Sequence, residues 1–298
     1  MLWIVLSLLG ALFTSLNVIL AKIGIKDVKS NLATFYRTGI VIICLVIICI
    51  ISGSIFKFSL LTKNNYIFLI LSGIATGCSW LCYYKALKIG DINKVAPIDK
   101  ASFVLTSILF IIFFFDTTTN NGDILTIAML VLAMILMLFG TILMIGRQEV
   151  KNEVSKTWLI YSILSAIFAS IVALFVKIGL KGIPSDLGTF LRTIIVFLFA
   201  FAIVIKKGEI KEIKKINKKT IVFLTLSGIA TGGAWLCEYS ALNILNVNPV
   251  AVSSINKLSI LLTMLLSYLI LKEKFTKKSL IGLSLLTLGI VIIITFSL

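Results

Sequence analysis

Ten long apolar stretches divide this chain and restrict what it can fold into. A bilayer core roughly 30 Å thick is crossed by about 20 apolar residues in a helix. Only helices and closed barrels pair every backbone polar group in lipid, and long runs without alternation favour helices. We therefore predict an all-α integral membrane protein with ten transmembrane helices. The predicted spans are 3–24, 32–52, 65–89, 95–115, 123–145, 157–180, 187–205, 220–244, 250–271 and 279–297.

The composition excludes several classes of function. Only 13% of the residues are charged, whereas soluble domains have about a quarter. The net charge is +16, but the lysines and arginines lie mostly in short loops, where they favour anionic lipid headgroups over nucleic acid. The chain has no histidine and no GxxxxGK[ST] loop. We therefore expect no His-based catalysis, no metal, no cofactor and no ATP hydrolysis, so the chain is not predicted to be an enzyme.

The basic residues predict the orientation of the chain. The loops that follow odd-numbered spans hold seventeen lysines and arginines, and the loops that follow even-numbered spans hold three. Cytoplasmic loops carry the excess of positive charge. We expect a multi-pass protein of the cell membrane with both termini on the outer side.

The two halves of the chain resemble each other. Residues 21–38 match residues 176–193, and residues 71–87 (LSGIATGCSWLCYYKAL) match residues 226–242 (LSGIATGGAWLCEYSAL), both at an offset of 155. After a two-residue slip, Asp99 and Lys100 match Asn256 and Lys257. We predict one repeat at 1–146, a linker at 147–156 and a second repeat at 157–298.

A repeat of five spans has an architectural consequence. The odd number places the second copy upside down, so a pseudo-two-fold axis in the membrane plane relates the copies. Many secondary transporters are built this way, with the substrate site near the midplane between the repeats. The sequence thus predicts two inverted five-helix repeats around a central cavity.

The repeated segments resemble the EamA-type family of the drug/metabolite transporter superfamily. The resemblance rests on three stretches in each half: the Lys-Ile-Gly segment with its following Ser and Arg, the SGIATG run, and the NKVAPIDKAS or INKLS segment. It covers nearly the whole chain and looks like two single-repeat members fused. One departure is Phe-Asp-Thr-Thr-Thr at 115–119, where the family usually has a Gly-Glu pair. The resemblance implies ten helices around a cavity and export of amino acids, metabolites or drugs.

Two lysines are the first candidate substrate-binding residues. Lys100 and Lys257 lie well inside the fourth and ninth spans, where a charge costs roughly 3 kcal/mol on insertion scales. Repeat symmetry would bring both to one cavity, with their neighbours Asp99 and Asn256, to bind a carboxylate or phosphate. The alternative is internal pairing, for which Glu238 is the better partner of Lys100.

Further candidates lie on the third and eighth spans. Glu238 is either a proton-coupling carboxylate or part of an ion pair. Trp80 and Tyr84 share one helix face, as do Trp235 and Tyr239, and these rings either wall the cavity or pack the core.

The remaining polar and small residues of the repeats are expected to be structural. Arg37 and Arg192, and Lys22 and Lys177, are expected to be anchors at the membrane interface. The GxxxG pairs Gly73/Gly77 and Gly228/Gly232 predict close helix packing. Pro249 predicts a helix start, or an irregular start that lines the cavity.

The leading functional hypothesis is a secondary transporter of a small metabolite, an amino acid or organic anion, that acts by alternating access. The alternatives are a proton-coupled exporter of cationic drugs and a non-transporting scaffold or channel. The expected partners are a small-molecule substrate and the lipid bilayer, and the protein is expected to be a monomer or homodimer.

Overall fold

The computed structural model describes residues 2–26, 28–90, 92–119, 122–145, 157–244, 247–272 and 275–297, and all regular structure in these ranges is helical. The predicted linker, residues 147–156, lies outside them. The first repeat contains α1 (Leu2–Gly24), α2 (Ser30–Ile51), α3 (Lys63–Ile89), α4 (Ile92–Phe113) and α6 (Ile124–Ile145). The second contains α7 (Thr157–Gly179), α8 (Ser185–Lys206), α9 (Lys218–Asn243), α10 (Pro249–Lys257), α11 (Ser259–Leu266), η4 (Ser267–Leu271) and α12 (Lys277–Ser297). Short elements lie between them: η1 (Ser54–Phe56), η2 (Phe58–Leu60), α5 (Phe115–Thr119) and η3 (Glu209–Lys215).

The predicted spans agree with the helices to within three residues at nearly every end. Nine helical runs in the described part of the chain are long and apolar enough to cross a membrane. The remaining predicted span, the fourth, corresponds to α4, in which Ala101–Phe113 forms a shorter apolar stretch among the described side chains. The protein is therefore a multi-pass membrane protein.

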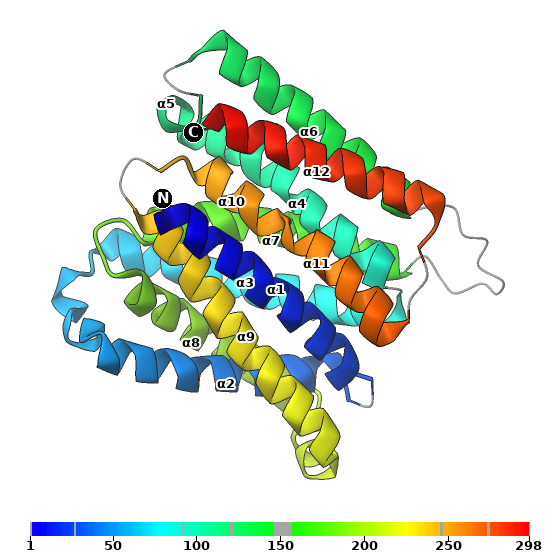
Figure 1. Ribbon diagram of the computed structural model, residues 1–298. Helices are drawn as coiled ribbons and strands as arrows, with labels where there is room; N and C mark the ends of the chain where they lie inside the picture. The colour runs from blue at the N-terminus through cyan, green and yellow to red at the C-terminus, as the bar shows by residue number, and fades with distance from the viewer. Residues whose placement is uncertain are drawn as a thin grey trace.

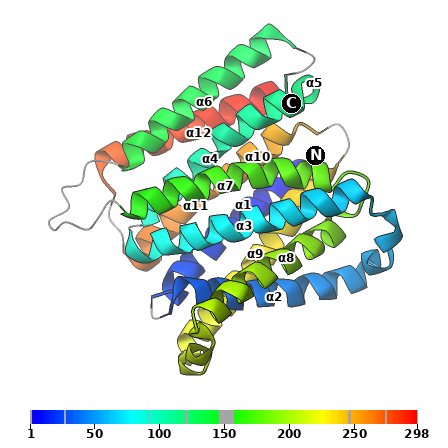
Figure 2. The ribbon, with the colours of Figure 1, turned by 180° about the vertical axis from the view of Figure 1, so that it is seen from behind.

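The two repeats run in opposite directions. In Figure 1, α1 passes from the N-terminus towards the lower right, whereas its counterpart α7 runs the other way, and α6 and α12 are likewise antiparallel. Figure 2 shows the same relation from behind, with both marked termini at one end of the molecule. The architecture is that of two inverted five-helix repeats, as the odd number of spans predicts.

The repeats interlock across the pseudo-two-fold axis. Helix α1 packs on α9 and, symmetrically, α3 packs on α7, while α2 packs on α8 and α6 on α12. The α6–α12 contact depends on small residues: a Cβ on Gly140 would lie 2.5 Å from the carbonyl oxygen of Gly282. Backbones approach this closely only where side chains are absent.

The ninth span is divided into three pieces. Pro249 occupies the first turn of α10, and the Asn248 side chain caps that turn by accepting a hydrogen bond from the Val250 N–H (2.9 Å). Pro249 therefore marks an ordinary helix start. Helix α10 ends at Lys257, and α11 begins at Ser259 after one intervening residue. The break directly after Lys257 positions that side chain at the end of a short helix.

Candidate functional site

A cavity with a volume of about 190 Å³ lies between the two repeats. Helices α1, α3 and α4 of the first repeat and α7, α8, α9 and α10 of the second contribute to its wall. Pockets for drug-sized ligands are typically about 300–1,000 Å³. The size of the cavity therefore favours a small ligand.

Most of the residues proposed from the sequence line this cavity. The polar and charged members are Asp99, Glu238, Asn256 and Lys257, and the aromatic members are Trp80, Tyr84, Trp235 and Tyr239. Lys100 lies in α4, but its side chain is outside the described part of the structure. Its proposed role, and its pairing with Glu238, stay predictions.

The interpretation of Arg37 and Arg192 as interface anchors is wrong. Both side chains are fully buried, with 0% of their surface exposed. Helix α2 begins at Ser30, so Arg37 lies about 10 Å along the helix, far from its end. Arg192 has the matching position in α8, and it lines the cavity.

Partners from both repeats hold the two guanidinium groups in place. Arg37 donates to the Asn17 Oδ1 (2.5 Å) and to the Thr231 Oγ1 (2.7 Å). Arg192 donates to the Tyr239 hydroxyl (2.5 Å) and to the repeat-related hydroxyl of Thr76. Each arginine therefore reaches across the pseudo-two-fold axis to a threonine of the opposite repeat.

The aromatic residues lie beside these arginines. The Arg37 guanidinium is 5.3 Å from the Trp80 ring centroid and 4.5 Å from that of Tyr84. Arg192 stacks in the same way on Trp235 (4.5 Å) and Tyr239 (5.1 Å). The rings wall the cavity, and they also hold the cations of the protein itself. Cation–π attraction compensates for part of the cost of burying each charge.

Both arginines retain unused donors. Among the described atoms, Arg37 Nε and Nη1 and Arg192 Nε are buried without a hydrogen-bond partner. A buried donor without a partner costs roughly 1–3 kcal/mol, and more when it is charged. Of the two arginines only Arg192 is among the residues that line the cavity, so its Nε is the donor closest in place to a bound acceptor.

The acidic residues of the cavity are held on separate helices. The Ser165 hydroxyl of α7 donates to Asp99 Oδ1 (3.1 Å), and Ser165 also contacts Ser79 of α3. Asn256, which corresponds to Asp99, accepts a hydrogen bond from Thr14 (3.2 Å). Within the described side chains, neither Asp99 nor Glu238 forms an ion pair. The wall therefore contains two carboxyl groups as well as the cations Arg192 and Lys257.

Two glycines allow the arginine helices to come close. A Cβ on Gly73 of α3 would lie 2.8 Å from the Arg192 carbonyl oxygen and 2.7 Å from the Ile195 Cβ. A Cβ on Gly228 of α9 would lie 3.1 Å from the Arg37 carbonyl oxygen. The GxxxG prediction of close packing is correct at these two positions, where α3 contacts α8 and α9 contacts α2.

The lysines at the ends of the first and sixth spans bind helix ends. Lys22 Nζ donates to the carbonyls of Leu87 (2.6 Å) and Gly90 (2.7 Å) at the end of α3. Lys177 Nζ donates to the Leu242 carbonyl (2.8 Å) at the end of α9. Cations stabilise helix C-termini, so these residues are structural, although they cap a neighbouring helix and are not interface anchors.

The comparisons with known proteins agree with this architecture. The model of the EamA-like transporter family matches residues 1–139 and 156–295. A curated relative from Sinorhizobium sp, "Uncharacterized transporter in cobO 3'region", is 40% identical over 111 residues, which are 37% of this chain and 79% of the relative. A solved structure described as "Crystal structure of protein" shares the fold, with a TM-score of 0.66 and 12% identity over 99% of this chain and 98% of that one. The chain belongs to the EamA-like transporter family and is a membrane transporter built from two copies of the EamA repeat.

Proposed function

We propose that this transporter is a secondary carrier that moves a small metabolite with a carboxylate group, an amino acid or an organic anion, by alternating access. The observation that carries the proposal is the cavity between the inverted repeats, whose wall contains both the cations Arg192 and Lys257 and carboxyl groups. Intramembrane charges usually face a substrate or ion path. The energy would come from a proton or substrate gradient.

The cationic residues of the cavity suit a carboxylate. A guanidinium presents planar donors that match a carboxylate with two parallel hydrogen bonds. The unused Nε of Arg192 supplies such a donor, and Lys257 adds a second positive charge. In this proposal Lys100 completes the group from the first repeat.

The acidic residues of the cavity favour an amino acid over a simple organic anion as the substrate. Asp99 and Glu238 line the same cavity and supply acceptors for an ammonium group. An amino acid matches both sets of charges, so we propose it as the preferred substrate class. Glu238 corresponds to Tyr83 in the first repeat, and this asymmetry makes it our candidate for proton coupling.

Repeat-related contacts at the two ends of the α2–α8 pair support alternating access. At one end, Asn31 Nδ2 donates to both carboxylate oxygens of Glu209 (3.2 Å). At the other end, the Ser52 and Ser54 hydroxyls donate to Asp186 Oδ2 (2.5 and 2.6 Å). Asn31 corresponds to Asp186, and Glu209 to Ser54, at the offset of 155. We propose that these two contacts break alternately during transport, so that the cavity opens first to one side of the membrane and then to the other.

Export of a cationic drug is the second candidate, because Asp99 and Glu238 offer negative charge to such a substrate. The positions of Arg37 and Arg192 count against it, since their guanidinium groups already lie over the aromatic rings. A channel or a scaffold is the remaining alternative. We also propose a cell-membrane location with both termini outside, as the loop charges predict.

Counterflow in proteoliposomes tests the proposed function. Vesicles preloaded with an unlabelled amino acid should accumulate the same labelled amino acid transiently and saturably, which a channel or scaffold does not do. Replacement of Lys257 or Lys100 by Gln should abolish the accumulation and leave the protein folded. The matched control is K277Q, which removes an exposed lysine at the start of α12. Saturable counterflow of organic cations alone would favour the drug exporter.

A further inference from the structure

A second cavity, with a volume of about 820 Å³, lies at one end of the bundle between α3, α7 and α8. Five of its lining residues are lysines: Lys29, Lys85, Lys88, Lys206 and Lys207. It is separate from the transport cavity, and no residue lines both. We call it the lysine pocket.

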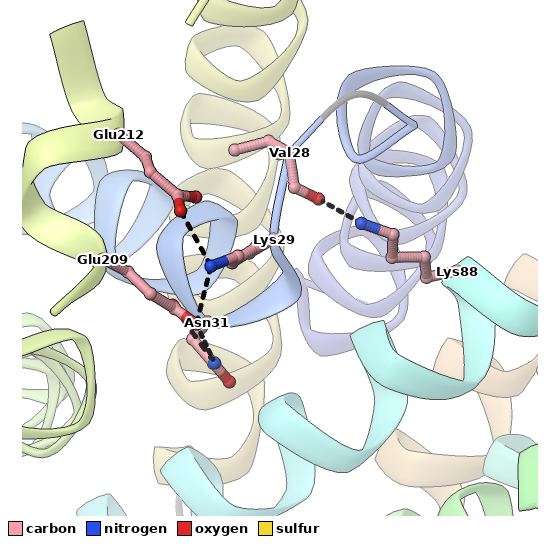
Figure 3. A network of polar contacts seen from close by, with 6 residues as sticks. All are labelled: Val28, Lys29, Asn31, Lys88, Glu209 and Glu212. Carbon is pink, nitrogen blue, oxygen red and sulfur yellow. Dashed lines mark hydrogen bonds and ion pairs between the residues drawn. The ribbon is translucent and has the colours of Figure 1, made fainter. Parts of the chain in front are cut away.

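Part of the rim of the lysine pocket is held by internal bonds, which Figure 3 shows. Lys29 Nζ binds Glu212 (2.8 Å), and the carboxylate of Glu209 accepts hydrogen bonds from Asn31 (3.2 Å). Lys88 Nζ donates to the Val28 carbonyl (2.9 Å). These bonds hold both glutamate carboxylates in place and position the loop before α2.

Three lysines of the pocket are left for a ligand. Lys85, Lys206 and Lys207 are exposed, and none of their ammonium groups makes a hydrogen bond or ion pair with another described group. The pocket wall beside them includes the half-buried Leu81, together with Ile203. The site therefore combines unpaired ammonium groups with an apolar wall.

The inverted repeat supplies an internal comparison for this charge. At the offset of 155, the residues that correspond to the five lysines are Pro184, Ser240, Asn243, Ile51 and Ser52. None of them carries a charge. The structural role of Lys88 is nevertheless retained, because its counterpart Asn243 donates to the Ile183 carbonyl (3.0 Å) as Lys88 does to Val28. The fold thus does not require lysine at these positions, so the charge on this face has another cause.

The membrane surface next to the pocket is apolar. Ile160 on α7 is 57% exposed, and Phe201 and Ile205 on α8 are 36% and 51% exposed. These side chains provide a surface for acyl chains close to the basic pocket. Basic pockets between transmembrane helices on the cytoplasmic side are suited to anionic lipid headgroups.

We propose that the lysine pocket is a binding site for the phosphate headgroup of an anionic phospholipid, with Lys85, Lys206 and Lys207 as its ligands. The acyl chains lie along α7 and α8. The general excess of basic residues in cytoplasmic loops accounts for charge on this face, but it does not account for three unpaired lysines around one cavity. The site does not depend on the identity of the transported substrate.

The test compares thermal stability in detergent with added phosphatidylglycerol, phosphatidylcholine or inorganic phosphate. Three proteins are compared: the wild type, K85Q/K206Q/K207Q, and the control K218Q/K277Q/K278Q. The control removes three exposed lysines at the starts of α9 and α12, outside the pocket. Phosphatidylglycerol should raise the melting temperature of the wild type and the control, because a ligand that binds only the folded state stabilises it.

The pocket variant should need about a hundredfold more phosphatidylglycerol for the same rise, since each lysine near an anionic surface contributes roughly fivefold in affinity. The variant K85R/K206R/K207R keeps the charge and should respond as the wild type does. An equal loss in the pocket variant and the control would overturn the proposal, because the effect would then be one of general surface charge. A rise with inorganic phosphate equal to that with phosphatidylglycerol would also overturn it, and would assign the pocket to a soluble phosphate compound.

Discussion

Trp80 of α3 and Trp235 of α9 stack on each other across the pseudo-two-fold axis, with their ring centroids 5.0 Å apart and an interplanar angle of 29°. Each ring also carries the arginine of its own repeat, Arg37 on Trp80 and Arg192 on Trp235. The centre of the transporter is thus a row of two cations and two rings, in which the stacked rings are neighbours and each ring contacts one arginine. A movement of one repeat against the other changes this row directly.

The geometry of Arg192 leads to the first prediction. In R192K the charge remains, but the bond to Tyr239 and the stacking on Trp235 are lost, because an ammonium lacks the planar fork of the guanidinium. Hydrogen bonds that involve a charged group contribute about 1.5–3 kcal/mol. We therefore expect substrate affinity to fall about ten- to a hundredfold, measured by counterflow. Wild-type affinity in R192K would show that Arg192 is purely structural.

Glu238 is the subject of the second prediction. E238Q removes the titratable group and keeps the size of the side chain. If Glu238 carries the coupling proton, uptake driven by a pH gradient should disappear, while exchange of substrate between the two sides of the vesicle should continue. A pH gradient that still drives uptake by E238Q would exclude Glu238 from proton coupling.

The GxxxG glycines differ in how tightly they are packed, and this provides a matched pair of variants. A Cβ on Gly73 meets the Ile195 Cβ at 2.7 Å, so G73A should lose about 1–3 kcal/mol of stability through overpacking. A Cβ on Gly232 lies 3.7 Å from the Cys44 Cβ, an ordinary contact, so G232A should be tolerated. Thermal unfolding in detergent measures both. Equal melting temperatures for the two variants would contradict the close approach of α3 and α8.

The N-terminus of α6 leads to a prediction about pH. Asp123, outside the membrane-spanning part, accepts hydrogen bonds from the Thr126 hydroxyl (2.7 Å) and backbone N–H (2.8 Å), and these bonds lower its pKa below the ordinary value of 3.8. A lowered folded-state pKa stabilises the protein above pH 3.8, and this contribution is lost as the pH falls through the folded-state pKa. D123A should therefore melt at a lower temperature than the wild type at neutral pH. The difference in melting temperature between D123A and the wild type should shrink as the pH falls below 3.8. A difference that is constant with pH would exclude a stabilising role for the ionised Asp123 carboxylate.

The amino-acid sequence determined the architecture of this protein. The ten apolar stretches predicted the helices closely, because in lipid a long apolar run without alternation pairs its backbone polar groups only as a helix. The offset of 155 between the halves, with five spans in each, predicted the inversion, because an odd number of crossings reverses the second copy. The same repetition identified candidate residues for the cavity wall on the matching segments, such as Trp80 and Trp235.

Only the tertiary structure decided which charges are buried at the centre. The sequence placed Arg37 and Arg192 near the starts of spans, where long basic side chains usually reach the interface. Their burial depends on partners from distant helices, such as Thr231 for Arg37 and Thr76 for Arg192, which no local pattern contains. A charge is stable inside a membrane protein only when groups from several helices compensate for its lost hydration, and the packing of those helices determines whether they meet.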